Sequence, residues 1–198
     1  MNNIINIFII FILILAPLNA SGTDLKDEEE FVNKFADEAI TILYNNEISD
    51  NEKNDKFTNL VMSAIDLNLI SQFVLSKTWK SATNDQKERY ISAFKKYFIN
   101  SYANKLDQYS GEKILVTGSE EAGKYVIVDS NIIREGTNTL KINLKWRLLN
   151  INGDIKIIDL NIEGISLVIA QREEFQSFLT NNNSDLEALI DKIISVSN

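Results

Sequence analysis

The stretch DLNIEGISLVIAQREEF, Asp159 to Phe175, changes its pattern at a glycine. Before Gly164, apolar Leu160 and Ile162 alternate with polar residues, which is typical of a strand with one buried face. After it, ISLVIA is apolar at nearly every position and QREEF is charged. We expect one long strand over residues 155–170 with a bulge or bend at Gly164, because strands usually run about 3–10 residues. Past the bend, we expect the core to cover one side of ISLVIA and a helix or a ligand to cover the other side. The alternative is that protein alone buries both sides of this segment.

Working outward, three more strands are predicted upstream, at residues 112–118, 124–134 and 138–149. The last of these is the clearest, because five apolar residues alternate with polar ones in period two. These apolar residues are Leu140, Ile142, Leu144, Trp146 and Leu148. Asn152-Gly153, which follows, has the residues that a tight hairpin turn needs.

The first half of the chain has no Gly or Pro between Gly22 and Gly111, which favours helices. Helices are predicted at residues 24–46, 54–64 and 67–75. Two capping boxes, TNDQ at 83–86 and SDLE at 184–187, predict the starts of two more. The pattern therefore indicates one α+β domain, with an antiparallel four-stranded sheet covered by helices.

The N-terminus indicates export. Residues 4–18 are apolar except for Asn6, which is too short a run to span a bilayer, and small Ala20 follows where a signal peptidase could cut. We expect a signal peptide at 1–20 and a single domain at 21–198; an uncleaved anchor is the alternative. A formal net charge of −8 argues against nucleic-acid binding. The chain has no His and no Cys, which removes the usual zinc ligands and the thiol to which a lipid could be attached. A carboxylate-only site for a hard cation stays open but has no loop signature, and we expect no metal and no cofactor.

Two features of the helix after residue 83 could serve binding. Its aromatic residues recur at helical spacing and would either pack in the core or line a cavity for acyl chains; they are Tyr90, Phe94, Tyr97, Phe98 and Tyr102. The segment 77–96 is locally basic and would either be a solvated face or contact a partner or a lipid headgroup. The candidate contacts are Lys80, Lys87, Arg89, Lys95 and Lys96.

Catalysis is disfavoured by the residues available. Asp159 and Glu163 would lie about 13 Å apart along one strand, farther than glycoside hydrolysis needs. We expect these two carboxylates and Asp129 to pair with Lys141, Lys145 or Arg147 across the exposed sheet face. Without His, the usual activated serine is missing.

Two blocks of sequence, in this order, resemble the MlaC, or toluene-tolerance, family of periplasmic phospholipid-binding proteins, over residues 30–193. The first block contains Trp79, Gln86, Tyr90, Phe94, Tyr102 and Ala103. The second contains Asp159, Gly164, Ser166, Leu167, Arg172 and Phe175. The chain departs from the family pattern at Ser76, Ile155 and Ala170-Gln171, which puts the shape of a pocket and its lipid preference in doubt.

The resemblance implies a helix-covered curved sheet with a deep apolar pocket for a phospholipid's acyl chains. It also implies a periplasmic shuttle, without enzymatic activity, between an inner-membrane lipid ABC-transporter complex and an outer-membrane lipoprotein complex, which maintains outer-membrane lipid asymmetry. A related branch acts in hopanoid biosynthesis, so the lipid could differ. We expect a monomer.

The pocket is expected between the buried sheet face and the helix after residue 83, closed by the segment after Gly164. The predicted lipid-binding residues are Phe94, Phe98, Tyr102, Leu140, Ile142, Leu144, Trp146, Leu160, Ile162, Ile165 and Leu167. Two alternatives from other classes stay open. One is a small cone-shaped α+β enzyme using Asp129, Asp159 or Glu163; the other is an interaction module with a dry core.

Overall fold

The computed structural model describes residues 24–103, 112–134 and 140–197. Only the backbone is described for Tyr102, Ala103, Arg134 and Leu140. The predicted signal peptide at 1–20 lies outside the described residues.

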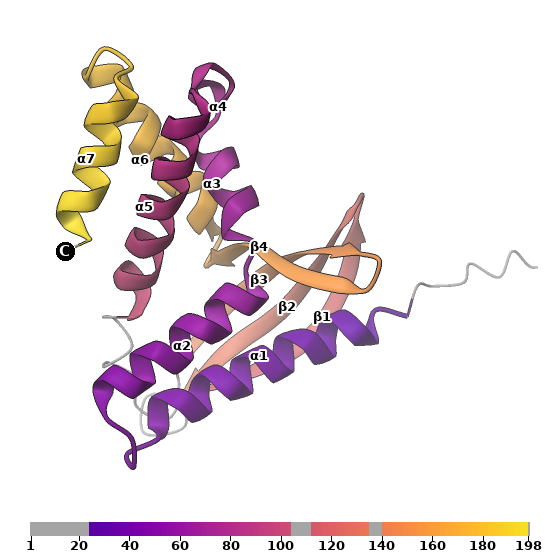
Figure 1. The fold of residues 1–198 in the computed structure, drawn as a ribbon. Coiled ribbons are helices and arrows are strands. Elements are labelled where there is room, and N and C mark those ends of the chain that lie inside the picture. Colours follow the sequence, from indigo (N-terminus) through magenta and orange to yellow (C-terminus); the bar gives the residue numbers. More distant parts are fainter. Residues whose placement is uncertain (1–23, 104–111, 135–139, 198) are drawn as a thin grey trace, which may run out of the picture.

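Helices α1 (Lys26–Tyr44) and α2 (Asp50–Ala64) lie along one face of the sheet (Figure 1). They confirm the two helices predicted first, although α2 begins earlier than expected because the Ser49 side chain caps it by accepting a hydrogen bond from the Glu52 N–H. From α1, Val32 and Ala36 are buried against the strands, and the Phe35 ring packs edge-on to Trp146 with centroids 5.8 Å apart.

The sheet has five antiparallel strands in the order β1-β2-β3-β4-β5, not the four predicted. The strands are β1 (Lys113–Ala122), β2 (Tyr125–Arg134), β3 (Leu140–Ile151), β4 (Asp154–Ile162) and β5 (Ile165–Ser166). The predicted turn at Asn152-Gly153 is confirmed, with φ of 55° and 89°, the positive values that a two-residue hairpin needs. The pairing register shifts at Gly118 in β1 and at Leu148 in β3, two irregularities that the sequence did not predict.

The long strand predicted over residues 155–170 is wrong. Glu163 and Gly164 both have positive φ, 50° and 88°, and they reverse the chain direction instead of bulging it. The chain then pairs for only two residues, as β5, before helix α6 (Leu167–Asn181) begins. ISLVIA is thus a short strand followed by the first turn of a helix, and Ile165, predicted to be covered, is 64% exposed.

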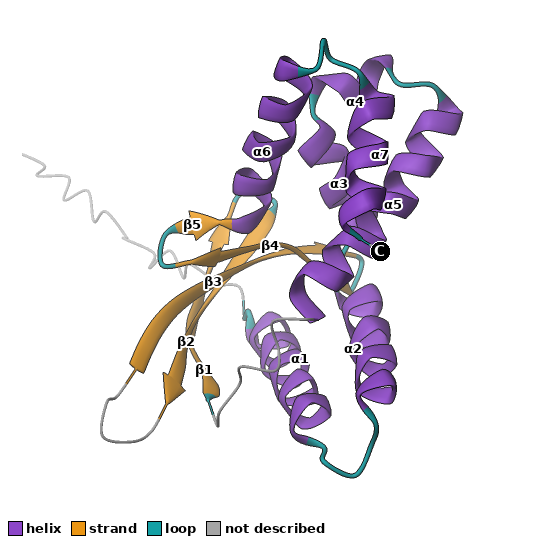
Figure 2. Cartoon of the chain, turned by 90° about the vertical axis from the view of Figure 1, so that its left-hand side faces the viewer, coloured by secondary structure: helices purple, strands orange, loops and turns teal. Residues whose placement is uncertain are grey.

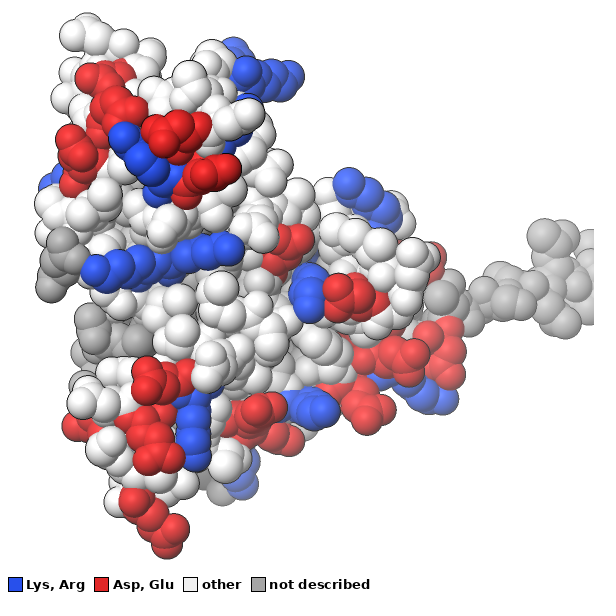
Figure 3. Space-filling view, in the orientation of Figure 1, with Lys and Arg blue, Asp and Glu red and all other residues white. Residues whose placement is uncertain are grey.

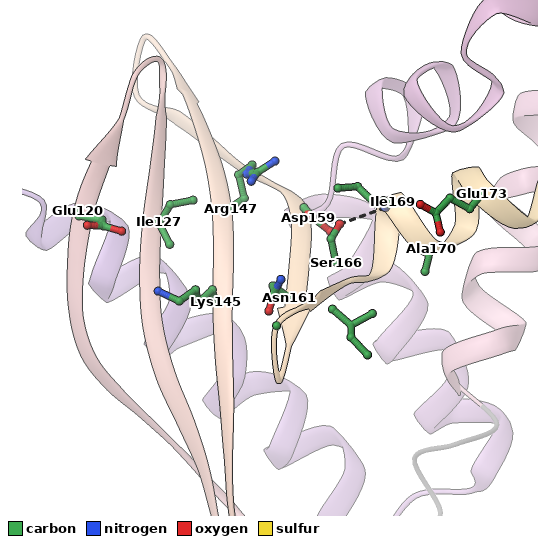
Figure 4. A pocket seen from close by; sticks show the side chains of 12 residues that line it. Glu120, Ile127, Lys145, Arg147, Asp159, Asn161, Ser166, Ile169, Ala170 and Glu173 are labelled. Atoms are coloured by element: carbon green, nitrogen blue, oxygen red, sulfur yellow. Dashed lines mark hydrogen bonds between the residues drawn. The ribbon is translucent and has the colours of Figure 1, made fainter.

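Hydrogen bonds to two side chains start α6 where it does. The Ser166 hydroxyl accepts from the Ile169 N–H at 3.1 Å, as an N-cap does. The buried Asp159 carboxylate on β4 accepts from the Ser166 hydroxyl at 2.6 Å and from the Val168 N–H at 3.2 Å (Figure 4). Asp159 therefore fastens the first turn of α6 to the sheet.

The remaining helices gather with α6 beyond the β4–β5 edge of the sheet (Figures 1 and 2). They are α3 (Leu67–Leu75), α4 (Lys77–Ser81), α5 (Asn84–Ala103) and α7 (Leu186–Val196). The first capping box is confirmed, because the Thr83 N–H donates to Gln86 Oε1 and the Gln86 N–H donates to Thr83 Oγ1. The second is wrong, because Asp185 caps α7 in place of Ser184.

The described residues form two hydrophobic cores. The helical core lies among α2, α3, α5, α6 and α7 and includes Tyr90, Phe94 and Phe175. The sheet core lies between α1 and the strands and includes Val128, Trp146 and Leu148. The cores are joined at the turn between α2 and α3, because Ile65 packs against both and Asp66 donates its N–H to the Ile157 carbonyl at 3.1 Å.

We expect Tyr90→Phe to make stability depend less on alkaline pH. Burial raises the pKa of the Tyr90 hydroxyl, which donates to the Ser71 carbonyl at 3.1 Å. Above the ordinary pKa of about 10, the unfolded state loses this proton and the folded state keeps it, so stability falls as pH rises. At pH 7 the variant should be less stable by about 1 kcal/mol, a deficit that shrinks or reverses above pH 10. Urea unfolding of both proteins at pH 7 and above pH 10 measures this difference in stability. The same deficit at the two pH values would contradict the prediction.

Asp159→Ala should destabilise the protein by about 1–3 kcal/mol, because it leaves a buried N–H and a hydroxyl without their acceptor. The control is Asp129→Ala, which removes only the exposed ion pair with Lys145, with Nζ 2.9 Å from the carboxylate oxygen. That change should cost less than about 1 kcal/mol. Equal midpoints of urea unfolding for the two variants would show that the Asp159 contacts do not hold α6.

Candidate functional site

A partly open apolar cavity of about 230 Å³ lies where the helical and sheet cores meet. Its walls come from α1, α2, the turn after α2, α3, α5, β3, β4 and the first turn of α6. The lining residues are Phe35, Phe57, Val61, Ile65, Ile70, Phe98, Trp146, Ile157, Asp159, Leu160, Leu167 and Val168. The arrangement can hold an apolar ligand and offers it few polar contacts.

Asp159 is the only charged residue in that lining, and its oxygens are engaged elsewhere. Both accept hydrogen bonds at the start of α6, and the residue is 6% exposed. The Trp146 indole N–H is likewise used, since it donates to the Ser130 hydroxyl at 2.8 Å. The surface presented to the cavity is therefore hydrocarbon and aromatic ring.

Four of the predicted lipid-binding residues line the cavity: Phe98, Trp146, Leu160 and Leu167. They come from α5, β3, β4 and α6, so the fold brings together positions up to 69 residues apart, as Phe98 and Leu167 show. Their proposed role in lipid binding stays a prediction.

The other predicted residues lie elsewhere. Phe94 is in the helical core, packed on Tyr90, Phe98 and Phe175. Leu144 is in the sheet core, with Ile142 and Ile162 packed against it. Ile165 is exposed outside the cavity. The side chains of Tyr102 and Leu140 lie outside the description. The helix bearing Phe94 does not cover the sheet as predicted; α1 does.

Sequence reasoning missed seven lining residues, chiefly from α1, α2 and α3. They are Phe35, Phe57, Val61, Ile65, Ile70, Ile157 and Val168. Each follows the apolar pattern of its element, so the sequence indicated that they are buried. Nothing in that pattern distinguishes a cavity wall from close-packed core.

A larger hollow of about 490 Å³ lies on the opposite face of the sheet, between the strands and the start of α6 (Figure 4). It is lined by side chains of both signs, among them Glu120, Lys145, Arg147 and Glu173. The mixed charge of its lining distinguishes it from the apolar cavity, although Asp159 borders both.

The three carboxylates considered for catalysis each have a structural contact. Asp129 pairs with Lys145, as predicted. Asp159 does not pair with a base as expected, because the chain that returns after Gly164 covers it and supplies two donors. Glu163 likewise forms no ion pair with the three expected bases of the described residues. It lies in the turn after β4, and its carboxylate accepts a hydrogen bond from the Asn143 N–H.

The basic segment 77–96 lies on α4 and α5 and shares its surface with acidic residues, and Figure 3 shows the two signs interleaved over these upper helices. Arg89 pairs with Glu187 and, at 3.7 Å, with Asp85. Lys87 lies 5.3 Å from the centroid of the Trp79 ring. The predicted contacts of Lys80, Lys87, Arg89, Lys95 and Lys96 with a partner or headgroup stay a prediction.

Within residues 24–103, 112–134 and 140–197, no group of three or more potential metal ligands comes together. Over the same ranges, no helix has the length and apolar character to cross a membrane.

The family model described as MlaC protein matches residues 33–195. The chain is 26% identical over 138 residues to the intermembrane phospholipid transport system binding protein MlaC of Haemophilus influenzae, covering 68% of this chain and 64% of that protein. It is 26% identical over 139 residues to the toluene tolerance protein ttg2D of Pseudomonas putida, covering 69% and 64%. The chain thus spans slightly less than two thirds of each relative's length.

A solved structure has the same fold. It is the phospholipid-binding protein from Ralstonia solanacearum in complex with a phospholipid, with a TM-score of 0.73 at 17% identity, covering 85% of this chain and 95% of that one. Because the family match extends over both cores and every wall of the cavity, the chain belongs to the MlaC protein family.

Proposed function

We propose that this protein is a periplasmic carrier that holds the acyl chains of a phospholipid in the cavity between its two cores. The observation that carries the proposal is the cavity lining, apolar from every contributing element, in a chain whose relatives are named for phospholipid transport and binding. The residues that we assign to binding the tails are Phe98, Trp146, Leu160 and Leu167, together with the seven lining residues that the sequence did not predict.

The energetics of lipid transfer suit such a site. Each buried CH₂ is worth about 0.8 kcal/mol, so a chain of about 16 carbons is held by roughly 13 kcal/mol against water. Exchange between a bilayer and an apolar cavity is nearly neutral by comparison, which makes loading reversible. A carrier of this kind needs a cavity and docking surfaces and no catalytic group.

The cavity must widen to hold whole lipid tails. Its 230 Å³ is below the range of about 300–1,000 Å³ common for small-molecule sites. The two cores meet along this cavity, so a small separation of α1 and the sheet from the helical core would enlarge it. Ile142, Leu144 and Ile162 of the sheet core and Phe94 of the helical core, which are not part of the present walls, would contact tails only in such a widened state.

The cellular role extends this proposal. The apolar run at residues 4–18 would export the chain as a cleaved signal peptide, leaving one carrier domain at 21–198. The carrier would exchange lipid with an inner-membrane transporter complex and an outer-membrane lipoprotein complex, and so maintain outer-membrane lipid asymmetry. Lys80, Lys87, Arg89, Lys95 and Lys96 are proposed to help it dock. If the bound lipid is of the hopanoid type, the protein is still a lipid carrier, but it serves a different pathway.

We expect native mass spectrometry of the protein, purified from the periplasm without detergent, to detect phospholipid bound at fixed stoichiometry. Val61→Phe directs a larger side chain into the cavity and should lower the lipid-bound fraction several-fold. The mass of the released lipid identifies the cargo.

The matched control is Val116→Phe, which packs against the sheet core away from the cavity. It should retain lipid as the wild type does. Lipid-free wild-type protein that is folded and takes up none from vesicles would contradict the carrier proposal. So would full occupancy in Val61→Phe.

A further inference from the structure

A small surface groove lies directly outside the cavity, between α3, the start of α6 and the ends of β2 to β4. It has a volume of about 130 Å³. Its walls are largely apolar, and Leu69, Phe73 and Ile169 are partly exposed there, at 37%, 45% and 45%. Such a concentration of exposed apolar side chains at a groove calls for a ligand or partner.

Only one layer of side chains separates the groove from the cavity. Ile70, Asp159 and Val168 line both hollows. Because these side chains are shared, rotation of Ile70 and Val168 would open a path between the two hollows. A lipid with its tails in the cavity could then extend its glycerol end into the groove.

Two cations line the groove, and a third lies beside one of its walls. Lys124 and Arg147 line it and flank the Tyr125 ring, with Nζ 5.1 Å and Cζ 5.8 Å from the ring centroid. Arg172 lies beside the Phe73 wall of the groove, with its Cζ 4.9 Å from the ring centroid, and one of its guanidinium N–H groups donates to the Ser76 hydroxyl at 2.9 Å. Figure 4 shows Arg147 directed away from Lys145 and toward the side where Asp159 and Ile169 lie.

None of these three cations forms an ion pair with a carboxylate of the described residues. Asp159, the groove's own carboxylate, is buried and its oxygens accept hydrogen bonds at the N-terminus of α6, so its charge is already stabilised. In a chain of net charge −8, an apolar groove that is lined by two cations without ion pairs, with Arg172 beside it, is complementary to an anion attached to hydrocarbon.

The larger hollow of Figure 4 is the weaker candidate for such an anion. Glu120 and Glu173 line it, and its Lys145 is already paired with Asp129. The predicted basic contacts on α4 and α5 line neither the groove nor the cavity.

We infer that the groove binds the phosphate of the carried lipid, through Lys124, Arg147 and Arg172, while the tails occupy the cavity. The inference rests on the proposed carrier function and adds a selection for phosphate-bearing lipids. It excludes diacylglycerol, which has the same tails and lacks the anion.

The test is a double charge reversal, Lys124→Glu with Arg147→Glu, both at exposed positions. Lipid-free protein is incubated with vesicles of dioleoylphosphatidylglycerol containing a minority of dioleoylglycerol, then re-isolated, and bound lipids are quantified by mass spectrometry. The ratio of phospholipid to diacylglycerol should fall about tenfold relative to wild type, since charge-assisted contacts to phosphate are lost. Total bound lipid should change less.

The matched control reverses two exposed cations outside the groove, Lys141→Glu with Lys192→Glu, and has the same net charge. Its ratio of phospholipid to diacylglycerol should equal the wild-type ratio. An equal fall of this ratio in both double variants would show a general effect of charge and would contradict the proposed phosphate site. An unchanged ratio in the groove variant would also overturn it.

Two further arms separate the remaining explanations. Soluble glycerophosphoglycerol, at the same concentration as the phospholipid, should leave the wild-type ratio unchanged. If the preference for phospholipid over diacylglycerol is lost, the groove binds a free phosphate ester and not the phosphate of the carried lipid. Wild-type protein that loads neither lipid would refute the carrier function itself, and this inference with it.

Discussion

The carboxylate of Asp159 joins the two parts of the molecule. Its oxygens accept from Ser166 and Val168, which fixes the first turn of α6 on β4 and, with it, the position of the helices beyond the sheet edge. A buried carboxylate is stable there because two donors and a helix N-terminus stabilise it. The same residue borders the cavity, the groove and the larger hollow, so the group that fixes the start of α6 also forms part of the wall of all three.

Much of the fold could be predicted from sequence because its signals are local. The Thr83 capping box, the Asn152-Gly153 turn and the alternation around Trp146 each depend on residues within one element. The segment after Gly164 could not, because a run such as ISLVIA suits a strand and a helix equally. Its helical state is selected by Asp159, which precedes the turn, and by burial of Val168, Phe175 and Leu179 in the helical core.

The candidate site could be predicted only in part for a related reason. Phe98, Trp146, Leu160 and Leu167 were found because they are large and apolar, but so are the core residues predicted beside them. Whether such a residue faces a cavity depends on how two cores meet at the turn after α2, a contact between Ile65 and Ile157 that joins distant parts of the chain. The sequence did not predict the cations at the groove as a group, because only the fold brings these residues of β3, α6 and the turn before β2 close together.

The central claim is that lipid tails lie against Trp146, and its fluorescence tests this directly. The chain has two tryptophans, so Trp79→Phe leaves Trp146 as the only one. The variant is titrated with a phospholipid brominated in its acyl chains, which quenches an indole on close contact. We predict strong quenching that saturates at the stoichiometry of bound lipid found by mass spectrometry. Stoichiometric binding without quenching would show that the tails lie elsewhere and would contradict this account.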